Sequence, residues 1–204
     1  MAVTTEPKLI RFSEYLLRPF DRRRTELVNG QVIEMAEASP LHVLIIKLLQ
    51  KMLDEHIKEI ASELDTYSGC GVQIPRTDRK SNVRDPDLVV CSAAQFQDML
   101  GLTKAIFLEG NPPALAVEVA SPGDTSRDTV DKRIEYALAK IPEYWIINPV
   151  DGVVLTMVLD GDQYRELGES EGSDPIVSEL FPKFSPIASV LLSGNVNKQQ
   201  KVNK

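Results

Sequence analysis

Two acidic residues stand in runs that are otherwise typical of buried β-strands. Glu118 lies inside the run from Leu115 to Ala120, which is short, apolar and rich in β-branched residues. Asp87 heads a second apolar run that ends at Cys91. An ionised carboxylate in such a strand costs several kcal/mol unless a partner pairs with it or a ligand binds it. Two acids on two candidate core strands therefore suggest a divalent cation held between them.

The neighbours of Glu118 leave room for such a cation. Side chains alternate along a strand, so Glu118 shares its face with Ala114, Ala116 and Ala120, which are all small. Two carboxylates suit a hard cation such as Mg²⁺ (or Mn²⁺), with waters at the remaining positions. A cation of this kind activates water for phosphodiester hydrolysis and stabilises the charge that develops on phosphate. A nearby lysine or arginine would orient the water or contact the phosphate.

Each of these residues also has a plainer interpretation. An acid beside proline, as Asp87 is, is commonly a turn residue, and a buried Glu118 could simply pair with an arginine. A lysine such as Lys132 is most often a solvated helix residue. By helical angle it lies away from the apolar stripe of Val130 and Ile134, so periodicity does not place it near the acids.

Length and composition favour a globular protein of one domain, with two small domains as the alternative. The chain has 204 residues, of which 43% are hydrophobic, which is enough for a core. We predict a single domain over residues 1–192 and a disordered tail over 193–204, where no apolar period is present. The net charge is -7 and the pI is near 5.0, which argues against a general nucleic-acid coat but leaves room for a local basic groove.

Cysteine usage and hydropathy favour a cytoplasmic protein that does not enter a membrane. Cys70 and Cys91 are the only cysteines and form no CxxC metal pattern, so we expect both to be reduced. The first residues lack an apolar signal-peptide core. The strongest apolar stretch, Leu41 to Leu49, is too short to span a bilayer.

The elements that must position the acids can be predicted from turn, cap and periodicity signals. Asn29-Gly30 predicts a type I′ turn within a hairpin, and Ser39-Pro40 predicts the start of a long helix. The helix expected after Glu118 has an apolar face made of Val130, Ile134, Ala137, Leu138 and Ile141. The expected helices are 13–17, 39–61, 94–100, 127–140 and 187–192, and the expected strands are 25–35 (a hairpin), 63–67, 71–75, 87–91, 115–120, 144–147, 153–159 and 163–167, with a turn over 76–84 and a loop closing at 111–113.

Several motifs in a fixed order resemble those of a known family. They are Thr25-Glu26-Leu27-Val28-Asn29-Gly30, Ser39-Pro40-Leu41-His42, Arg84-Asp85-Pro86-Asp87, Val117-Glu118-Val119-Ala120-Ser121-Pro122, Asp131-Lys132-Arg133-Ile134-Glu135-Tyr136 and Pro142-Glu143-Tyr144-Trp145-Ile146-Ile147-Asn148-Pro149. The chain resembles, from Phe12 to Val190, the Uma2 (DUF820) restriction-endonuclease family of the PD-(D/E)XK nuclease-like superfamily. The resemblance implies a restriction-endonuclease-like α/β fold, with a central mixed sheet flanked by helices. It also implies that Asp87 and Glu118 are metal carboxylates and that Glu26 joins the metal shell.

One position departs from the superfamily pattern. The superfamily motif has a lysine two residues after the strand glutamate, and here that position is Ala120. The resemblance assigns the basic role to Lys132 on the following helix, with Arg127 and Arg133 as alternatives. His42 also matches a family motif; it could support the site or, equally well, cap a helix.

The tyrosines and tryptophan of these motifs are expected to be packing residues. Tyr136, Tyr144 and Trp145 have no basic residues interleaved with them, so they do not form a base-stacking platform.

The expected function is Mg²⁺-dependent hydrolysis of DNA phosphodiester bonds. The catalytic residues would be Asp87, Glu118, Lys132 and Glu26. A homodimer is expected from the fold, because two sites can then meet two strands. Two alternatives stay open: a nuclease fold that binds nucleic acid or a protein without cleaving, which the missing strand lysine and the acidic pI favour, and a hydrolase of another phosphate ester.

Overall fold

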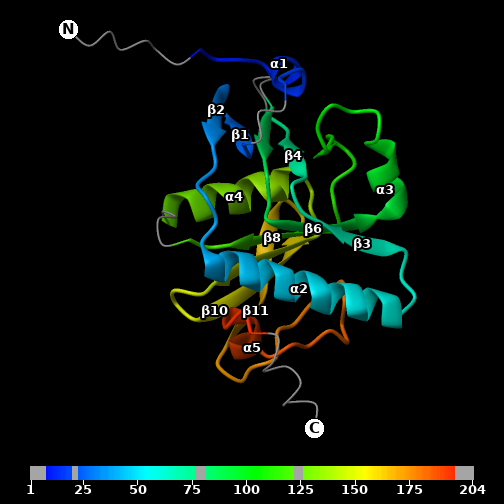
Figure 1. Ribbon diagram of the computed structural model, residues 1–204, viewed down its shortest axis with the longest axis vertical. Coiled ribbons are helices and arrows are strands. Elements are labelled where there is room, and N and C mark those ends of the chain that lie inside the picture. Colours follow the sequence, from blue (N-terminus) through cyan, green and yellow to red (C-terminus); the bar gives the residue numbers. More distant parts are fainter. Residues whose placement is uncertain (1–7, 20–22, 77–80, 122–125, 196–204) are drawn as a thin grey trace, which may run out of the picture.

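The computed structural model describes residues 8–19, 23–76, 81–121 and 126–195 (Figure 1). The predicted disordered tail falls largely on residues 196–204, and part of the predicted loop after Glu118 falls on 122–125. Both lie outside the described residues.

A six-stranded sheet carries both candidate acids. Its strand order is β11-β10-β9-β8-β6-β3. Strands β8 and β9 run parallel, and the other neighbours run antiparallel. Helix α4 connects β8 to β9, which gives the β-α-β crossover that a parallel pair requires. The bounds are β3 Leu64–Tyr67, β6 Leu88–Ser92, β8 Leu115–Val119, α4 Ser126–Leu138, β9 Glu143–Asn148, β10 Val153–Asp160 and β11 Gln163–Glu171.

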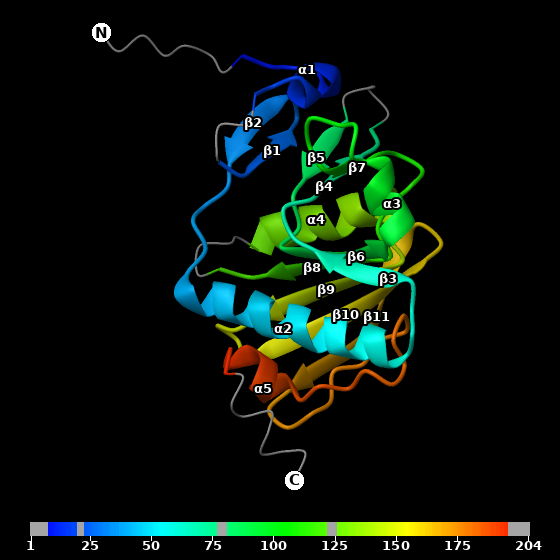
Figure 2. The ribbon, with the colours of Figure 1, turned by 45° about the vertical axis from the view of Figure 1, so that its right-hand side comes forward.

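A second sheet of five strands lies at the end of the molecule that carries α1 (Figure 2). Its order is β2-β1-β5-β4-β7, with only β4 and β7 parallel among the pairs described. The predicted hairpin is confirmed, with Asn29 and Gly30 both at positive φ in its turn. The bounds are α1 Phe12–Leu16, β1 Thr25–Val28, β2 Gln31–Glu34, β4 Gly71–Ile74, β5 Asn82–Arg84 and β7 Ile106–Phe107.

Helices cover both faces of the six-stranded sheet. Helix α2 (Pro40–Glu59) begins where predicted, because Ser39 Oγ accepts the backbone N–H of His42 at 3.2 Å. Its buried residues pack with Leu115 and Val117 of β8, together with the short helix α5 (Ala188–Leu192). Ala116, which points the other way, packs with residues of α4 instead. The alternation predicted along β8 is therefore confirmed, and Figure 2 shows α2 and α4 on opposite sides of this sheet.

The predicted fold class, a mixed α/β fold with helices flanking the sheet, is confirmed, and the strands are divided between two sheets. Two segments differ from the prediction. The expected turn over 76–84 contains strand β5, and the expected loop before 113 contains the two-residue strand β7 in addition to the predicted short helix, α3 (Ala93–Asp98). Both strands owe their existence to pairing with β4, a long-range contact that local composition does not reveal.

The predicted apolar face of α4 is confirmed only in part. Ala137 and Ile141 are buried, whereas Val130, Ile134 and Leu138 are all about half exposed; Tyr136, which was not assigned to that face, is buried. The helix is turned so that its mixed polar side meets the two sheets. Within the part of the chain that the structure describes, no helix is long and apolar enough to cross a bilayer.

Candidate active site

Asp87 and Glu118 face each other across two paired strands. Leu88 of β6 pairs antiparallel with Val117 of β8, and continuing that register by one residue places Asp87 opposite Glu118. Two hydrogen bonds hold the junction. The backbone N–H of Asp87 donates to the Val117 carbonyl at 3.0 Å, and the Val119 N–H donates to Asp87 Oδ2 at 2.9 Å. Residues opposite one another in an antiparallel pair are neighbours, so the two acids predicted from separate motifs are brought together.

The carboxylate of Glu118 receives two donors from α4. Lys132 Nζ lies 3.1 Å from Oε2, and the Tyr136 hydroxyl donates to Oε1 at 2.6 Å. Burial raises the pKa of Glu118 to about 7; the ammonium of Lys132 acts against this rise, and the charge of Asp87 adds to it. A carboxyl of this pKa gains or loses its proton near neutral pH, which is typical of functional sites.

Lys132 therefore reaches the site because α4 buries its mixed polar side rather than its apolar stripe. Its side chain is only 12% exposed. Tyr136 lies one turn further along the same side and is fully buried. The helical-angle argument that placed Lys132 away from the acids is thus wrong, since it assumed that the apolar stripe faced the core.

Glu26 joins the same group from β1. Its Oε1 lies 3.8 Å from Lys132 Nζ, so the ammonium stands between Glu26 and Glu118. Its Oε2 accepts Arg84 Nη1 at 2.6 Å, and Arg84 also pairs with Glu135 of α4. This buried chain of charges ties the first strand to the helix and fixes where Lys132 can point.

Asp87 has partners of its own on the opposite side. His42 Nε2 lies 3.2 Å from Oδ1, and Arg24 Nη1 lies 3.3 Å from the same oxygen. Burial acts to raise the pKa of Asp87, but the hydrogen bonds from His42 and from the Val119 amide, with the charge of Arg24, hold that pKa below its ordinary value. Of the two roles considered for His42, the helix cap falls to Ser39, which accepts the His42 N–H, while the His42 imidazole meets the candidate acid.

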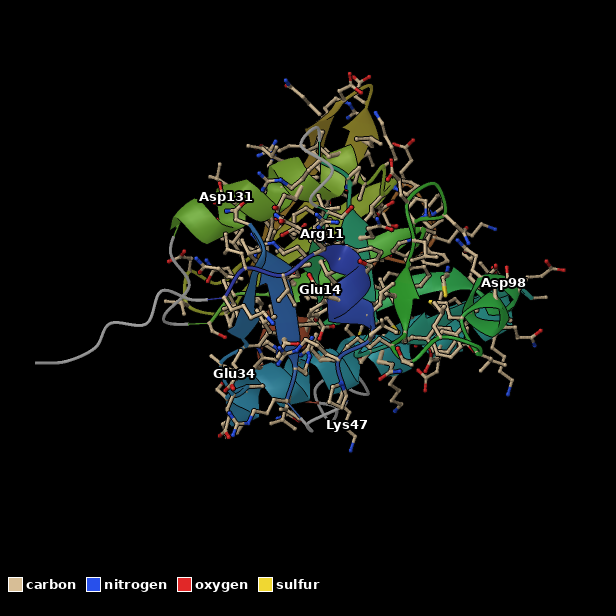
Figure 3. All side chains as sticks on the ribbon, turned by 90° about the horizontal axis from the view of Figure 1, so that it is seen from above. Arg11, Glu14, Glu34, Lys47, Asp98 and Asp131 are labelled. Carbon is tan, nitrogen blue, oxygen red and sulfur yellow. The ribbon has the colours of Figure 1, made fainter. Side chains whose placement is uncertain are left out.

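Of these groups, Arg24, His42, Asp87, Glu118 and Lys132 line one cavity of about 580 Å³. Glu34 of β2 is one of its lining residues, and Figure 3 labels it together with Asp131, the neighbour of Lys132 on α4. The cavity is polar, with acids and cations interleaved. Its lining residues are Arg23, Arg24, Glu34, Met35, Ala36, Glu37, Ala38, His42, Asp87, Glu118, Val119, Ser121 and Lys132.

The donor set fits a hydrated divalent cation rather than a fully protein-bound one. Among the described residues, no group of three or more histidine, cysteine, aspartate or glutamate side chains is arranged to hold a metal ion. Mg²⁺ needs only one or two carboxylates because it keeps several waters, and Asp87 with Glu118 supplies two. The contacts with which such a cation would compete are those of Arg24 and His42 with Asp87 Oδ1, at 3.3 and 3.2 Å, and that of Lys132 with Glu118 Oε2, at 3.1 Å.

Arg133, one of the two alternative basic residues, does not enter this group. Arg133 Nη2 donates to the Tyr164 carbonyl at 3.1 Å, and its Nη1 lies 3.4 Å from Glu166 Oε1, both on β11. The side chain of Arg127 falls outside the described part of the chain.

The three aromatic residues expected to pack do so, but Tyr136 does more. Tyr144 and Trp145 are buried in the sheet, and Trp145 Nε1 donates to Glu143. Tyr136 also donates its hydroxyl to Glu118, a contact that sequence reasoning missed. The available signal was its spacing of four residues from Lys132, which places both side chains on one side of the helix.

Comparisons with known proteins agree with this fold. A family model described as "Uma2: Putative restriction endonuclease" matches residues 12–192. The crystal structure of a putative nuclease belonging to DUF820 from Anabaena variabilis ATCC 29413 superposes with a TM-score of 0.71 and 16% identity, covering 91% of this chain and 98% of that one. A cryo-EM structure of a DrdV–DNA complex aligns over 63% of this chain and 12% of its own at 12% identity, with a TM-score of 0.29. No curated protein matches the chain.

Proposed function

The chain belongs to the Uma2 family, described as putative restriction endonucleases, and from this premise we propose that it is a metal-dependent endonuclease that hydrolyses DNA phosphodiester bonds. One observation carries the proposal. Asp87 and Glu118 stand opposite each other on paired strands, with Lys132 Nζ 3.1 Å from Glu118, on the wall of one cavity.

In this proposal Asp87 and Glu118 hold the cation, which would be Mg²⁺ or Mn²⁺. When bound, that ion would lower the pKa of water and neutralise charge on the phosphate. Asp87 presents Oδ1 to the cavity because the Val119 amide fixes its Oδ2. Tyr136 fixes Oε1 of Glu118 in the same way, which leaves Oε2 as the oxygen that faces Lys132.

Lys132 positions the attacking water or the substrate phosphate. Its ammonium is nearly buried between the carboxylates of Glu26 and Glu118, which gives it a fixed direction. Glu26 is a positioning residue. It contacts Lys132 and Arg84 and so helps to fix the position of the Lys132 ammonium. These contacts supply from the helix the cation that Ala120 cannot supply from the strand.

The cavity holds cations that could contact an anionic substrate, although its lining also includes the acids Glu34, Glu37, Asp87 and Glu118. Arg23, Arg24 and Lys132 line the cavity, and His42 adds a titratable group. A phosphodiester would meet these cations at the mouth of an otherwise acidic protein.

The test compares plasmid nicking by the wild type with nicking by Asp87→Asn and Glu118→Gln in Mg²⁺ or Mn²⁺. Both variants should lose cleavage by 100-fold or more, about the loss seen when a group acting on transition-state charge is removed. Asp98→Asn on α3 and Glu169→Gln on β11, both exposed, are the matched controls and should cleave normally. Equal nicking by wild type and both site variants would refute the site.

Two further readouts separate the alternatives. A wild type that binds DNA and never nicks it would indicate a silent nuclease fold. Hydrolysis of bis-p-nitrophenyl phosphate or RNA in preference to DNA would indicate a different phosphate ester as substrate.

A homodimer is part of the proposal, because two sites are needed to cut two strands together. Helix α4 supports it by exposing Val130, Ile134 and Leu138 along one side, an apolar stripe that a second copy could cover. Light scattering after size exclusion measures the mass directly. A monomer at micromolar concentration, together with single-strand nicking only, would rule out the dimer.

A cytoplasmic location is also proposed. Cys70 and Cys91 are free thiols and both are buried, as predicted for a protein kept in a reducing compartment. Cell fractionation with thiol labelling tests this point.

A further inference from the structure

Arg24 is the cation closest to the candidate metal carboxylates on the side away from Lys132, and no sequence signal assigned it a role. It lies immediately before β1, and its guanidinium makes four hydrogen bonds. Three of them go to a single short segment: Nε donates to Asp85 Oδ2 at 2.9 Å, and Nη2 donates to the carbonyls of Asp85 and Pro86 at 3.0 and 3.3 Å. The fourth, from Nη1 to Asp87 Oδ1, is also 3.3 Å long.

The two edges of this guanidinium are therefore unequal. The edge formed by Nε and Nη2 is anchored by three acceptors of residues 85 and 86. The Nη1 end reaches the metal carboxylate by one contact at the long end of the hydrogen-bond range. Loss of that contact alone would leave Arg24 in place with one N–H-bearing nitrogen turned to the cavity.

Asp85 explains why the Nε–Nη2 edge of Arg24 stays anchored. Its side chain is about nine-tenths buried, and its Oδ1 accepts no hydrogen bond from the residues that the structure describes. A buried carboxylate with one unsatisfied oxygen is expensive, and the contact that offsets the cost is the ion pair with Arg24. Asp85 belongs to the Asp85-Pro86-Asp87 motif, of which only Asp87 has a place in the proposed catalytic group.

Arg24 also stands between two cavities. It lines the 580 Å³ cavity of the candidate site and a second one of about 420 Å³, whose wall includes Asp85 and Lys104. Its side chain is 42% exposed, far more than the 12% of Lys132. Lys132 is thus held inside the site, whereas Arg24 is reachable by a large ligand.

We infer that Arg24 is a substrate-binding residue whose Nη1 exchanges the Asp87 carboxylate for a phosphate oxygen of the DNA strand. Without a cation, its Nη1 neutralises Asp87. With a cation between Asp87 and Glu118, Nη1 turns to a phosphate oxygen of the DNA strand, while Asp85 keeps the other edge fixed. Guanidinium is suited to this because its donors lie in a rigid plane and pair with phosphate oxygens. Asp85 is the positioning residue. The inference rests on the proposed endonuclease function and adds to it a named phosphate contact.

The two roles make opposite predictions for one substitution, which gives a sharp test. In Arg24→Ala, Asp87 loses a competitor, so Mn²⁺ measured by electron paramagnetic resonance without DNA should bind about three- to tenfold more tightly. The same variant should bind a short DNA duplex more weakly in Ca²⁺ and cleave it at least about 30-fold more slowly in Mn²⁺. A residue that only stabilised the fold would not tighten Mn²⁺ binding while it slowed cleavage.

Matched variants guard against a folding artefact. Arg24→Lys keeps a charge but cannot satisfy both aspartates and two carbonyls, so it should fold normally and lose roughly tenfold in cleavage. Arg165→Ala removes an exposed arginine of β11 and should change neither readout. Asp85→Asn should slow cleavage in the wild-type background and have little further effect in Arg24→Ala, because Asp85 acts through Arg24.

The outcomes separate this inference from the function on which it rests. A wild type that neither binds Mn²⁺ nor cleaves DNA would overturn the proposed function, and the inference with it. A wild type that does both, beside an Arg24→Ala protein with unchanged or weaker Mn²⁺ binding or unchanged cleavage, would overturn the role of Arg24 alone.

Discussion

Lys132 Nζ lies 3.1 Å from Glu118 Oε2, although 14 positions and a change from strand to helix separate the two residues. The superfamily pattern would place this ammonium two residues after the glutamate, on the strand itself, where this chain has Ala120. The β8–α4–β9 crossover places α4 against the sheet, so the ammonium of Lys132 reaches Glu118 from the helix. In this chain the lysine that pairs with the strand acid therefore comes from the helix.

This pairing predicts that Lys132 can be replaced from the strand. Lys132→Met should lower DNA cleavage by roughly 100-fold or more, because the ammonium acts where charge develops. Adding Ala120→Lys should restore about tenfold of that loss, since position 120 shares a strand face with Glu118. Plasmid nicking rates measure both. Lys140→Met is the control, as Lys140 lies just past α4 and bonds the exposed Asp162; equal loss in this control would contradict the assignment.

The raised pKa of Glu118 predicts a pH-dependent stability in metal-free buffer. The ordinary pKa is 4.5 and the folded value is about 7, so the folded chain holds a proton that the unfolded chain releases between these values. The resulting stability is fully present below pH 4.5 and is lost as the pH rises to 7, by about 3 kcal/mol in the free energy of unfolding. Urea titrations in EDTA at pH 5 and pH 8 measure it.

Glu118→Gln serves as the reference for that measurement, because it cannot titrate and all other groups cancel in the comparison. The lowered pKa of Asp87 acts only near and below its ordinary value of 3.8 and does not enter this window. Identical pH profiles for wild type and Glu118→Gln would show that Glu118 is ionised throughout.

The hydroxyl of Tyr136 should matter for activity beyond its share in stability. Tyr136→Phe leaves one buried oxygen of Glu118 without its donor, and we expect a loss of about 1–3 kcal/mol in stability and 10- to 100-fold in cleavage. Tyr164→Phe is a close control, because its buried hydroxyl donates to the Ile141 carbonyl at 2.7 Å in the same core cluster. Urea denaturation and nicking rates should show two destabilised proteins, of which only Tyr136→Phe is slow.

Glu143 is a buried acid outside the candidate site, and its environment predicts a structural role. Trp145 Nε1 and the Ser178 hydroxyl donate to its Oε1 at 2.7 and 2.8 Å, and the amides of Glu179 and Leu180 donate to its Oε2 at 3.0 and 2.7 Å. In Glu143→Gln, an amide group would face donors, which should cost about 2–4 kcal/mol of unfolding free energy.

Cleavage by Glu143→Gln, measured well below its melting temperature, should match the wild type. A selective loss of cleavage without loss of stability would place Glu143 in the catalytic group instead.

The sequence alone determined the local parts of the site. Asp87 and Glu118 were identified as acids in apolar strands because charge in such a run is costly and is therefore informative. The hairpin turn at Asn29-Gly30 and the start of α2 at Ser39 were predictable because turn and cap chemistry depends on neighbouring residues. Alternation then gave the correct two faces of β8, which a period of two fixes without reference to the rest of the fold.

Only the tertiary structure decided which side of α4 is buried. Half-exposing Val130, Ile134 and Leu138 forgoes roughly 3 kcal/mol of apolar burial. Leaving buried Glu118 and Arg84 without the helix partners Lys132, Tyr136 and Glu135 would cost roughly 3–5 kcal/mol for each charge. Burial of the polar side of α4 is therefore the more favourable arrangement. Helical periodicity could not reveal which side is buried, because the charged partners of that side lie on strands far away in the sequence. The same reason hid Arg24, whose partners are 61 and 63 positions away.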